Sequence, residues 1–262
     1  MPVRPPRGII IGLTTWPIRA NPPPASMPLQ AVESSRLYRQ IAEQLRGLIA
    51  GGEFAPGTRL PAERDLAKQL GVSRPSVREA LIALEVEGWV EVRTGSGIYV
   101  RPQAARAPAP RAGAQAPEWG PLELLRAREL VEGEVAALAA RHARKAQVTA
   151  MADALARMQD DAAAGRAPRH GDEDFHTVIA QACGNEVLGD TVRGYWHARG
   201  PMAARLGDHF ETPASWNAAL KEHAQVLQAI RDRDADAARA AMQHHLKKAY
   251  GRYNASWREA TP

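Results

Sequence analysis

One short segment of the chain, DEDFH at residues 172–176, has residue types that could bind a metal ion. Asp172 and His176 stand four residues apart, and in a helix this spacing places both side chains on one face. A carboxylate oxygen and an imidazole nitrogen are both common metal ligands. In isolation such a pair is more often a solvated ion pair, so a metal site requires further ligands elsewhere in the chain. Asp174 faces roughly the other way and is left out of the predicted site.

Two later histidines lie on helix faces that the sequence predicts to be buried. His223 is in line with Val226 and Ile230, and His245 shares a face with Met242. Burying several ionisable groups costs free energy unless the groups are paired or coordinated. One oxygen and three nitrogens suit a divalent metal ion such as zinc, nickel or manganese. The predicted metal ligands are therefore Asp172, His176, His223 and His245.

These candidate ligands lie in a half of the chain with helical periodicity almost throughout. Apolar residues make up 45% of the chain but aromatic residues only 5%, and the excess is alanine, which has the best helix propensity. Six or so helices joined by short loops form a bundle. The predicted helices span about 121–146, 148–164, 171–183, 185–206, 215–232 and 234–256.

Two proline-rich segments divide the chain into domains. We predict that residues 1–32 are a disordered extension and that residues 102–120 are a linker, because repeated prolines interrupt any helix there. Residues 33–101 then form one domain with mixed helix and strand patterns. Residues 121–256 form a second domain that is helical throughout.

The composition narrows the class of protein. A net charge of +5 suits a polyanionic partner without requiring one. The single cysteine, Cys183, excludes a disulfide within the chain and fits a reducing cytoplasm. The best apolar run, at residues 8–16, is about half the roughly 20 residues that a membrane span needs. We therefore expect a cytoplasmic protein without a membrane partner.

Residues 33–101 carry the pattern of a winged helix-turn-helix. The turn LGVSRP joins two predicted helices, an arrangement that presents the second helix to the major groove of DNA. Ser73 is placed to cap this helix, whose N-terminus favours phosphate, and arginines near its start can bind guanine. Three polar residues cluster there: Arg74, Ser76 and Arg78. A hairpin follows, with glycines at its tip that let the backbone approach a phosphate. The predicted fold is a winged helix-turn-helix (α+β) joined to an all-α bundle.

The motifs LPAERDLA, GVSRPSVREAL and GSGIYV, within residues 37–100, resemble the winged helix-turn-helix of GntR-type bacterial transcription regulators. The chain departs from the family pattern at Pro75, where some members have a polar contact residue. Position by position, the resemblance implies DNA contacts from Arg64, Ser73, Arg74, Ser76 and Arg78, and from Thr94 and Gly95 in the wing.

The helical half resembles the effector-binding domain of the FadR-type branch of the same regulators. The resemblance rests on the segments RELVEGEVAALAA, DEDFHTVIAQACGN and KEHAQVLQAIRDRDADAARAAMQHHL. In many members of that branch, the matching Asp-x-x-x-His pair and two later histidines hold a metal ion. The resemblance therefore implies a metal at the four residues identified above.

A metal with four protein ligands in octahedral geometry has two positions left for a bidentate carboxylate. Arg128 shares a predicted inward face with Leu125 and Val135, and its guanidinium can grip a carboxylate. Its alternative role is a salt bridge to Glu132, four residues on. The predicted effector-binding residues are Arg128, Glu132 and Arg199.

We therefore expect a transcription regulator that acts as a repressor. It is expected to bind double-stranded palindromic operator DNA as a homodimer. Its effector is expected to be a small carboxylate such as a sugar acid. A metal-dependent hydrolase with an accessory DNA-binding domain is the alternative, in which Glu132 would be the base. No nucleophile or base motif accompanies that residue. A third possibility is a bundle that only dimerises.

Overall fold

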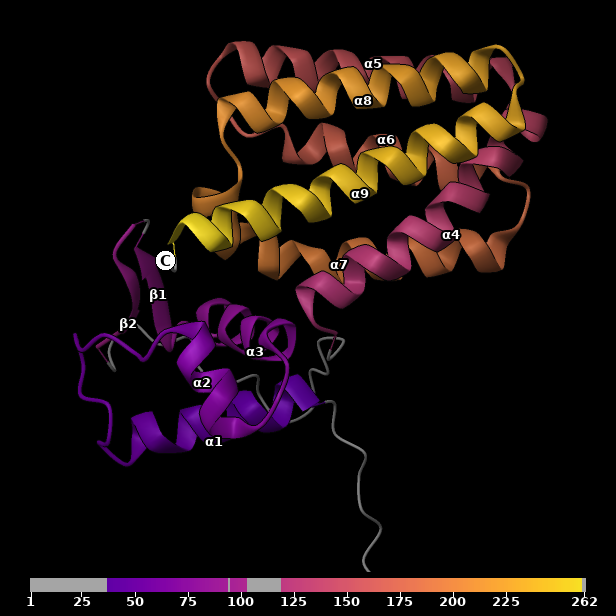
Figure 1. Ribbon diagram of the computed structural model, residues 1–262. Coiled ribbons are helices and arrows are strands. Elements are labelled where there is room, and N and C mark those ends of the chain that lie inside the picture. Colours follow the sequence, from indigo (N-terminus) through magenta and orange to yellow (C-terminus); the bar gives the residue numbers. More distant parts are fainter. Residues whose placement is uncertain (1–36, 94, 103–118, 261–262) are drawn as a thin grey trace, which may run out of the picture. The chain divides into compact units, whose positions relative to one another are not determined.

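The computed structural model of the chain describes residues 37–93, 95–102 and 119–260 (Figure 1). The predicted disordered extension at residues 1–32 lies outside the described residues, as does most of the predicted linker. The described residues form a winged part and a helical part, as predicted from the sequence.

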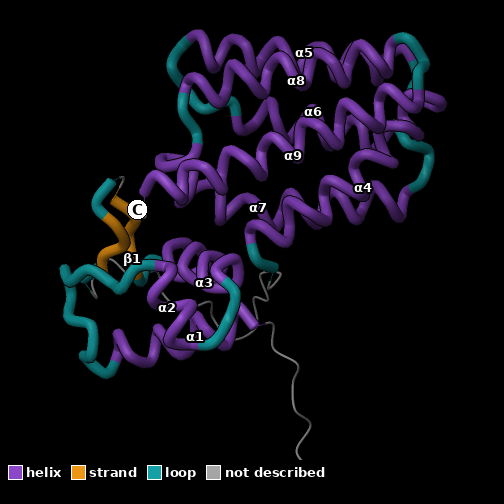
Figure 2. The backbone as a smooth tube through the Cα atoms, in the orientation of Figure 1, coloured by secondary structure: helices purple, strands orange, loops and turns teal. Residues whose placement is uncertain are grey.

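The winged part contains three helices and a two-stranded antiparallel sheet (Figure 2). The elements are α1 (Leu37–Ala50), α2 (Glu63–Leu70), α3 (Arg74–Val86), β1 (Val90–Arg93) and β2 (Gly97–Val100). Val90 pairs with Val100 and Arg93 with Gly97, which sets the hairpin register. Buried side chains from all three helices and both strands form its core, among them Leu45, Leu66, Leu81, Val90 and Ile98.

Local sequence explains how the helix-turn-helix is formed. α2 ends at Gly71, whose φ of 65° lies in the left-handed region that glycine adopts without strain. Ser73 caps α3 by accepting a hydrogen bond from the Ser76 backbone N–H, and Pro75 lies in the first turn of that helix. The predicted cap and the predicted helix end are both confirmed.

The helical part contains α4 (Pro121–His142), α5 (Lys145–Ala163), α6 (Arg169–Ala182), α7 (Glu186–Phe210), α8 (Pro213–Arg231) and α9 (Ala235–Ala260). All six predicted helices are present. The first ends four residues before its predicted end, because Arg144 takes an extended conformation and its backbone N–H donates to Gln147 Oε1 at 2.9 Å at the start of α5. No glycine or proline marks this boundary in the sequence.

Small residues allow the helices of this part to pack closely. α9 packs along α4 and also against α8, while α5 packs against α6 (Figure 1). Ala136, Ala139 and Ala140 of α4 are fully buried, and a Cβ atom added at Gly133 would lie 2.7 Å from Gln243 Cγ of α9. Cys183 is a buried core residue, as predicted. Among the described helices, none combines the length and the apolar character needed to cross a membrane.

Candidate functional site

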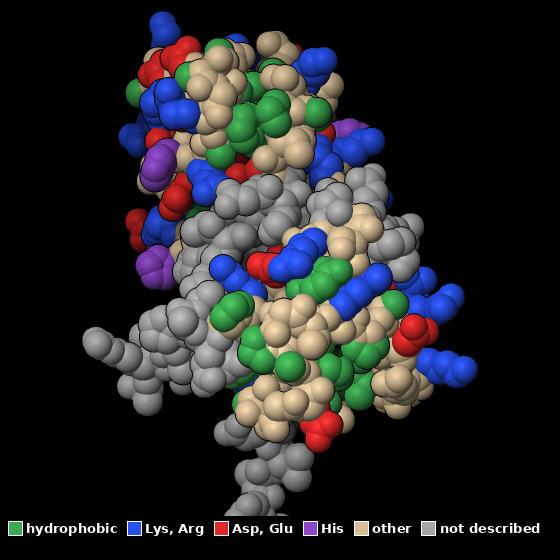
Figure 3. All heavy atoms as spheres, turned by 90° about the vertical axis from the view of Figure 1, so that its left-hand side faces the viewer, with side chains coloured by type: hydrophobic (Ala, Val, Ile, Leu, Met, Phe, Trp, Pro, Cys, Tyr) green, Lys and Arg blue, Asp and Glu red, His purple; other side chains and the backbone are tan. Residues whose placement is uncertain are grey.

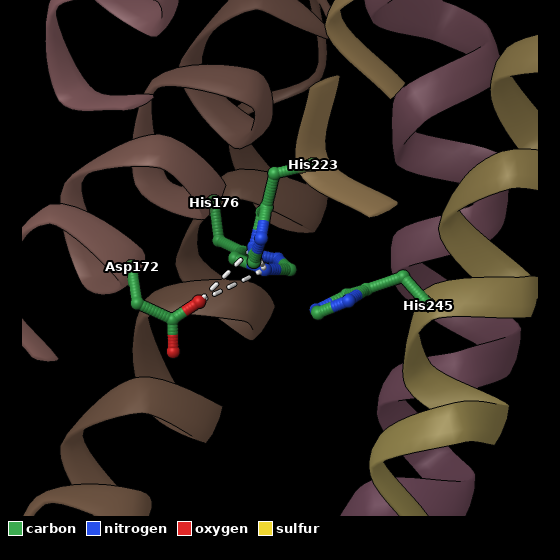
Figure 4. Close-up of side chains that lie close together, drawn as sticks. All are labelled: Asp172, His176, His223 and His245. Atoms are coloured by element: carbon green, nitrogen blue, oxygen red, sulfur yellow. Dashed lines mark hydrogen bonds and ion pairs between the residues drawn. The ribbon is translucent and has the colours of Figure 1, made fainter. Parts of the chain in front are cut away.

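The four predicted metal ligands lie together inside the helical part (Figure 4). α6 supplies Asp172 and His176, α8 supplies His223, and α9 supplies His245. One ligand atom from each residue lies within 4.8 Å of the ligand atoms of the other three. Asp174, on a different face of α6, is exposed and forms an ion pair with Arg157. Helical spacing therefore predicted which side chains the fold brings together.

Each of the three imidazoles is oriented by an interaction at its Nδ1 atom. The pairs are His176 with the Glu132 carboxylate, His223 with the Ala219 carbonyl oxygen at 2.7 Å, and His245 with the Glu222 carboxylate at 2.8 Å. Carbonyl and carboxylate oxygens accept hydrogen bonds, so each Nδ1 atom donates. A neutral ring then keeps its lone pair on Nε2, the atom that remains available to a metal.

The Nε2 lone pairs converge with the Asp172 carboxylate. His176 Nε2 and His223 Nε2 are 3.2 Å apart, and Asp172 Oδ1 lies 3.1 Å from His223 Nε2 and 3.7 Å from His176 Nε2. Burial lowers the pKa of His176, and burial together with the nearby His223 lowers the pKa of His245 to about 3, so both rings are neutral at pH 7. Acceptor atoms that converge in this way repel one another unless a cation lies between them. The donor set therefore fits a divalent metal ion.

Glu132 lies behind the ligands, between Arg128 and His176. One carboxylate oxygen accepts a hydrogen bond from Arg128 Nε at 2.5 Å, and the other pairs with His176 Nδ1. Burial acts to raise the pKa of this carboxylate, but Arg128 and His176 outweigh it and lower the pKa to about 2. The side chain is absent from the described wall of the neighbouring cavity. Its contacts with His176 and Arg128 orient those two side chains, and the effector contact expected from the sequence stays a prediction.

Arg128 and Arg199 are held by one aromatic ring. Their guanidinium carbons lie 4.4 Å and 4.6 Å from the centroid of the Trp196 ring, which is buried. Arg199 Nη2 also lies 3.2 Å from Asp172. Burial acts to raise the pKa of Asp172, but Arg199, His223 and His176 together outweigh it and hold the pKa well below the usual value. The two arginines are therefore fixed in place beside the ligand set.

A cavity of about 110 Å³ opens next to the four ligands. Its wall includes Asp172 and His245 from the ligand set, together with Arg128 and Arg199. A molecule in this cavity could touch the metal position and two guanidinium groups, which bind carboxylates in a planar, two-pronged geometry. Two of the three predicted effector-binding residues therefore line the cavity.

Sequence reasoning missed several polar residues around this cavity. In the wall these are Arg169, Glu211, Trp216 and Arg252, and behind it Glu222. A pattern existed for two of them. Glu222 immediately precedes a predicted ligand, and Arg252 follows His245 by seven residues, close to two helical turns. The other three lie at or near helix ends, where only the tertiary structure shows which way a side chain faces.

The predicted DNA-binding arginines differ in their surroundings. The side chains of Arg64 and Arg74 are 80% and 55% exposed. In contrast, Arg78 donates from Nε and Nη2 to the two carboxylate oxygens of Glu63, at 2.8 and 2.9 Å. Arg74 Nε donates to the same carboxylate at 2.9 Å. Arg78 therefore belongs to an ion-pair cluster that orients the start of α3. The sequence predicted only a DNA contact for this residue.

The remaining predicted DNA contacts lie at the cap of α3 and in the wing. The Ser73 and Ser76 hydroxyl oxygens are 2.8 Å apart, so the Ser76 hydroxyl contacts the capping hydroxyl of Ser73. Gly95 has a φ of 70°, a conformation that explains the need for glycine in the wing. Thr94 lies outside the described residues. Lys and Arg side chains are prominent on the face of the winged part in the lower half of Figure 3.

Comparisons with known proteins agree with this architecture. The gntR family of bacterial regulatory proteins matches residues 37–100, and the FCD domain matches residues 123–248. The Uxu operon transcriptional regulator of Escherichia coli (strain K12) is 38% identical over 223 residues, covering 83% of this chain and 86% of that protein. The Exu regulon transcriptional regulator of the same organism is 37% identical, covering 84% of this chain and 85% of that protein.

A third relative is the HTH-type transcriptional repressor NanR of Klebsiella aerogenes, 33% identical over 85% of this chain and 86% of that protein. All three relatives are named as transcriptional regulators or repressors, and none as an enzyme, so they give no support to the hydrolase alternative. With both parts matched in the order found here, the chain belongs to the gntR family of bacterial regulatory proteins, among the members that carry an FCD domain.

Proposed function

We propose that this transcription regulator is a repressor whose operator binding is controlled by a small carboxylate, such as a sugar acid, bound at a metal centre in the helical part. The metal ligands in this proposal are Asp172, His176, His223 and His245. The observation that carries the proposal is the orientation of the three imidazoles, because each Nδ1 atom has an acceptor and each Nε2 atom is left for a metal. When bound, the ion would supply Lewis acidity toward a ligand oxygen.

Charge balance around the cavity supports an anionic ligand. Four arginines each have a carboxylate partner: Arg128 with Glu132 at 2.5 Å, Arg199 with Asp172 at 3.2 Å, Arg169 with Glu211 at 2.9 Å, and Arg252 with Glu222 at 2.8 Å. These charges cancel, and a histidine that binds a metal does so as the neutral ring, which adds no charge. A divalent ion therefore brings an excess of positive charge into a largely buried site. A ligand carboxylate beside Arg128 and Arg199 would offset that excess.

The winged part supplies the DNA-binding side of the proposal. Arg64 in α2 and Arg74 at the start of α3 are both exposed, and the N-terminus of α3 also favours phosphate. We further propose that two copies of the chain act as a homodimer on a palindromic operator, because one helix-turn-helix reads only a half-site. The carboxylate controls DNA binding only if the DNA-binding and non-binding arrangements of the dimer differ in their affinity for it.

Two measurements on the full chain test this function. The first is a thermal-shift screen of sugar acids and short hydroxy acids, with and without zinc, nickel or manganese. We expect a carboxylate to raise the Tm only when metal is present. The second measures affinity for a DNA site selected from a randomised library, which the active carboxylate should weaken. If no carboxylate shifts the Tm of the metal-loaded protein, the effector role fails, and a bundle that only dimerises explains the helical part better.

A further inference from the structure

The cavity has a second polar end formed by residues that the proposed metal site does not use. Arg169 at the start of α6, Glu211 just before α8, and Trp216 in the first turn of α8 all line the cavity. Arg169 Nε lies 2.9 Å from Glu211, and Glu211 lies 3.8 Å from Arg199, which itself contacts Asp172. A series of ion pairs therefore connects the metal ligands to this second end.

Charges at the second end are already balanced. Arg169 has Glu211 as its partner, and Arg252, elsewhere in the cavity wall, makes two contacts with Glu222, at 2.8 and 3.1 Å. A ligand carboxylate placed here would approach the Glu211 carboxylate, and the nearby guanidinium groups are already engaged by protein carboxylates. The excess positive charge of a bound metal lies at the other end. The second end is therefore suited to neutral polar groups.

Trp216 adds an uncharged hydrogen-bond donor to this end. Its Nε1 atom is buried, and no hydrogen-bond acceptor for it lies within reach among the described residues. A buried N–H group without an acceptor costs free energy, which a ligand oxygen would recover. Glu211 supplies the complementary acceptor, because an ionised carboxylate only accepts. A hydroxyl group, which both donates and accepts, matches this combination.

We propose that Arg169, Glu211 and Trp216 form a hydroxyl-binding subsite that selects polyhydroxylated monocarboxylates over simple hydroxy acids and over dicarboxylates. Trp216 Nε1 donates to a ligand hydroxyl, and Glu211 accepts from one. The ligand carboxylate lies at the metal end, beside Arg128 and Arg199. This inference rests on the proposed function and specifies which feature of the ligand, apart from its carboxylate, the cavity recognises.

Three six-carbon ligands with the same 2-hydroxycarboxylate end test the subsite by isothermal titration of the full chain loaded with zinc. D-gluconate carries further hydroxyls, 2-hydroxyhexanoate lacks them, and D-glucarate ends in a second carboxylate. We expect D-gluconate to bind roughly tenfold more tightly than either of the others. Equal affinity for D-gluconate and 2-hydroxyhexanoate, or tighter binding of D-glucarate, would overturn the subsite. Binding of none of the three would overturn the carboxylate role itself, and the subsite with it.

Substitution of the indole then assigns the effect to one residue. Trp216→Phe should weaken D-gluconate binding roughly fivefold and leave both 2-hydroxyhexanoate binding and zinc affinity unchanged. Trp119→Phe, which removes an indole N–H outside the cavity wall, is the matched control and should change neither ligand. An equal loss of both ligands in Trp216→Phe would show a general packing role and overturn the assignment of Trp216 as the hydroxyl donor.

Discussion

Glu85 in the winged part and Glu132 in the helical part are both buried, but their pKa values shift in opposite directions. Burial raises the pKa of Glu85 to about 7, because the Val92 backbone N–H at 2.9 Å and the charge of Arg101 offset only part of the desolvation. Burial acts on Glu132 as well, but Arg128 and His176 outweigh it and lower the pKa to about 2.

This difference separates two uses of a buried carboxylate. Glu85 connects α3 to β1 through a backbone hydrogen bond, and near neutral pH it is only partly ionised. Glu132 is fully ionised and organises two cationic or metal-binding side chains. The raised pKa of Glu85 thus accompanies a packing role. The pKa of Glu132, lowered by its cationic partners, accompanies a place beside the proposed metal ligands.

The largest expected effect comes from removing a ligand of the helical part. His223→Ala should lower the affinity for zinc or nickel at least about 100-fold, because one of four donor atoms is lost. Competition with a chromophoric chelator measures this affinity. His244→Ala is the matched control, since His244 is exposed and adjacent to a proposed ligand. Similar metal affinity in the two variants would show that His223 is not a metal ligand.

Glu85→Gln tests the other half of the comparison through its pH dependence. The folded pKa of about 7 lies above the ordinary value of 4.5, so the folded state binds the proton more tightly and stability falls as pH rises between these values. The neutral amide should therefore leave stability nearly unchanged at pH 4 and raise it by about 3 kcal/mol at pH 8. Urea unfolding at both pH values checks this, and a variant less stable at pH 8 would show that the ionised carboxylate is favourable.

Glu132→Gln examines whether the ionised carboxylate supports the metal ligands from behind. We expect metal affinity to fall about tenfold, because an amide orients His176 less strongly and no longer balances Arg128. Glu134→Gln, on the same helix but exposed and paired with Arg239, provides the comparison variant. Chelator competition should separate the two variants, and equal affinities would mean that Glu132 has a packing role like that of Glu85.

The smallest effect is expected at the exposed face of the winged part. Arg64→Ala should weaken DNA binding severalfold and reduce the slope of log K against log salt by about one, the change expected for a lost phosphate contact. Fluorescence anisotropy at several salt concentrations measures both values. Arg141→Ala, at the exposed end of α4, should leave the slope unchanged. If Arg64→Ala also left it unchanged, Arg64 would not contact phosphate.

Short-range patterns predicted most of the fold and the centre of the site. The spacing of Asp172 and His176, and the apolar stripe that includes His223, determine which way these side chains face once helices form. The pairing of Arg78 with Glu63 joins residues fifteen positions apart across a turn, and no periodicity reveals it. The same holds for Trp216, whose place in the cavity wall depends on how α8 packs.

Helix boundaries show the same limit. The break after His142 depends on the extended conformation of Arg144, which lacks the glycine or proline that usually announces a helix end. In contrast, Gly71 and Ser73 mark the turn before α3 clearly. A boundary marked by a glycine and a serine cap was therefore predictable, and one that rests on the local contact between Arg144 and Gln147 was not.

The close crossing of α4 and α9 at Gly133 has a mechanical consequence. Gly133 directly follows Glu132, and Gln243, its neighbour across the crossing, lies two residues before His245. Because the Gln243 side chain lies directly against Gly133, neither helix can slide far past the other without a steric clash. We expect the two helices to move as one rigid body, so a ligand held between Arg128 and His245 would displace α4 and α9 together.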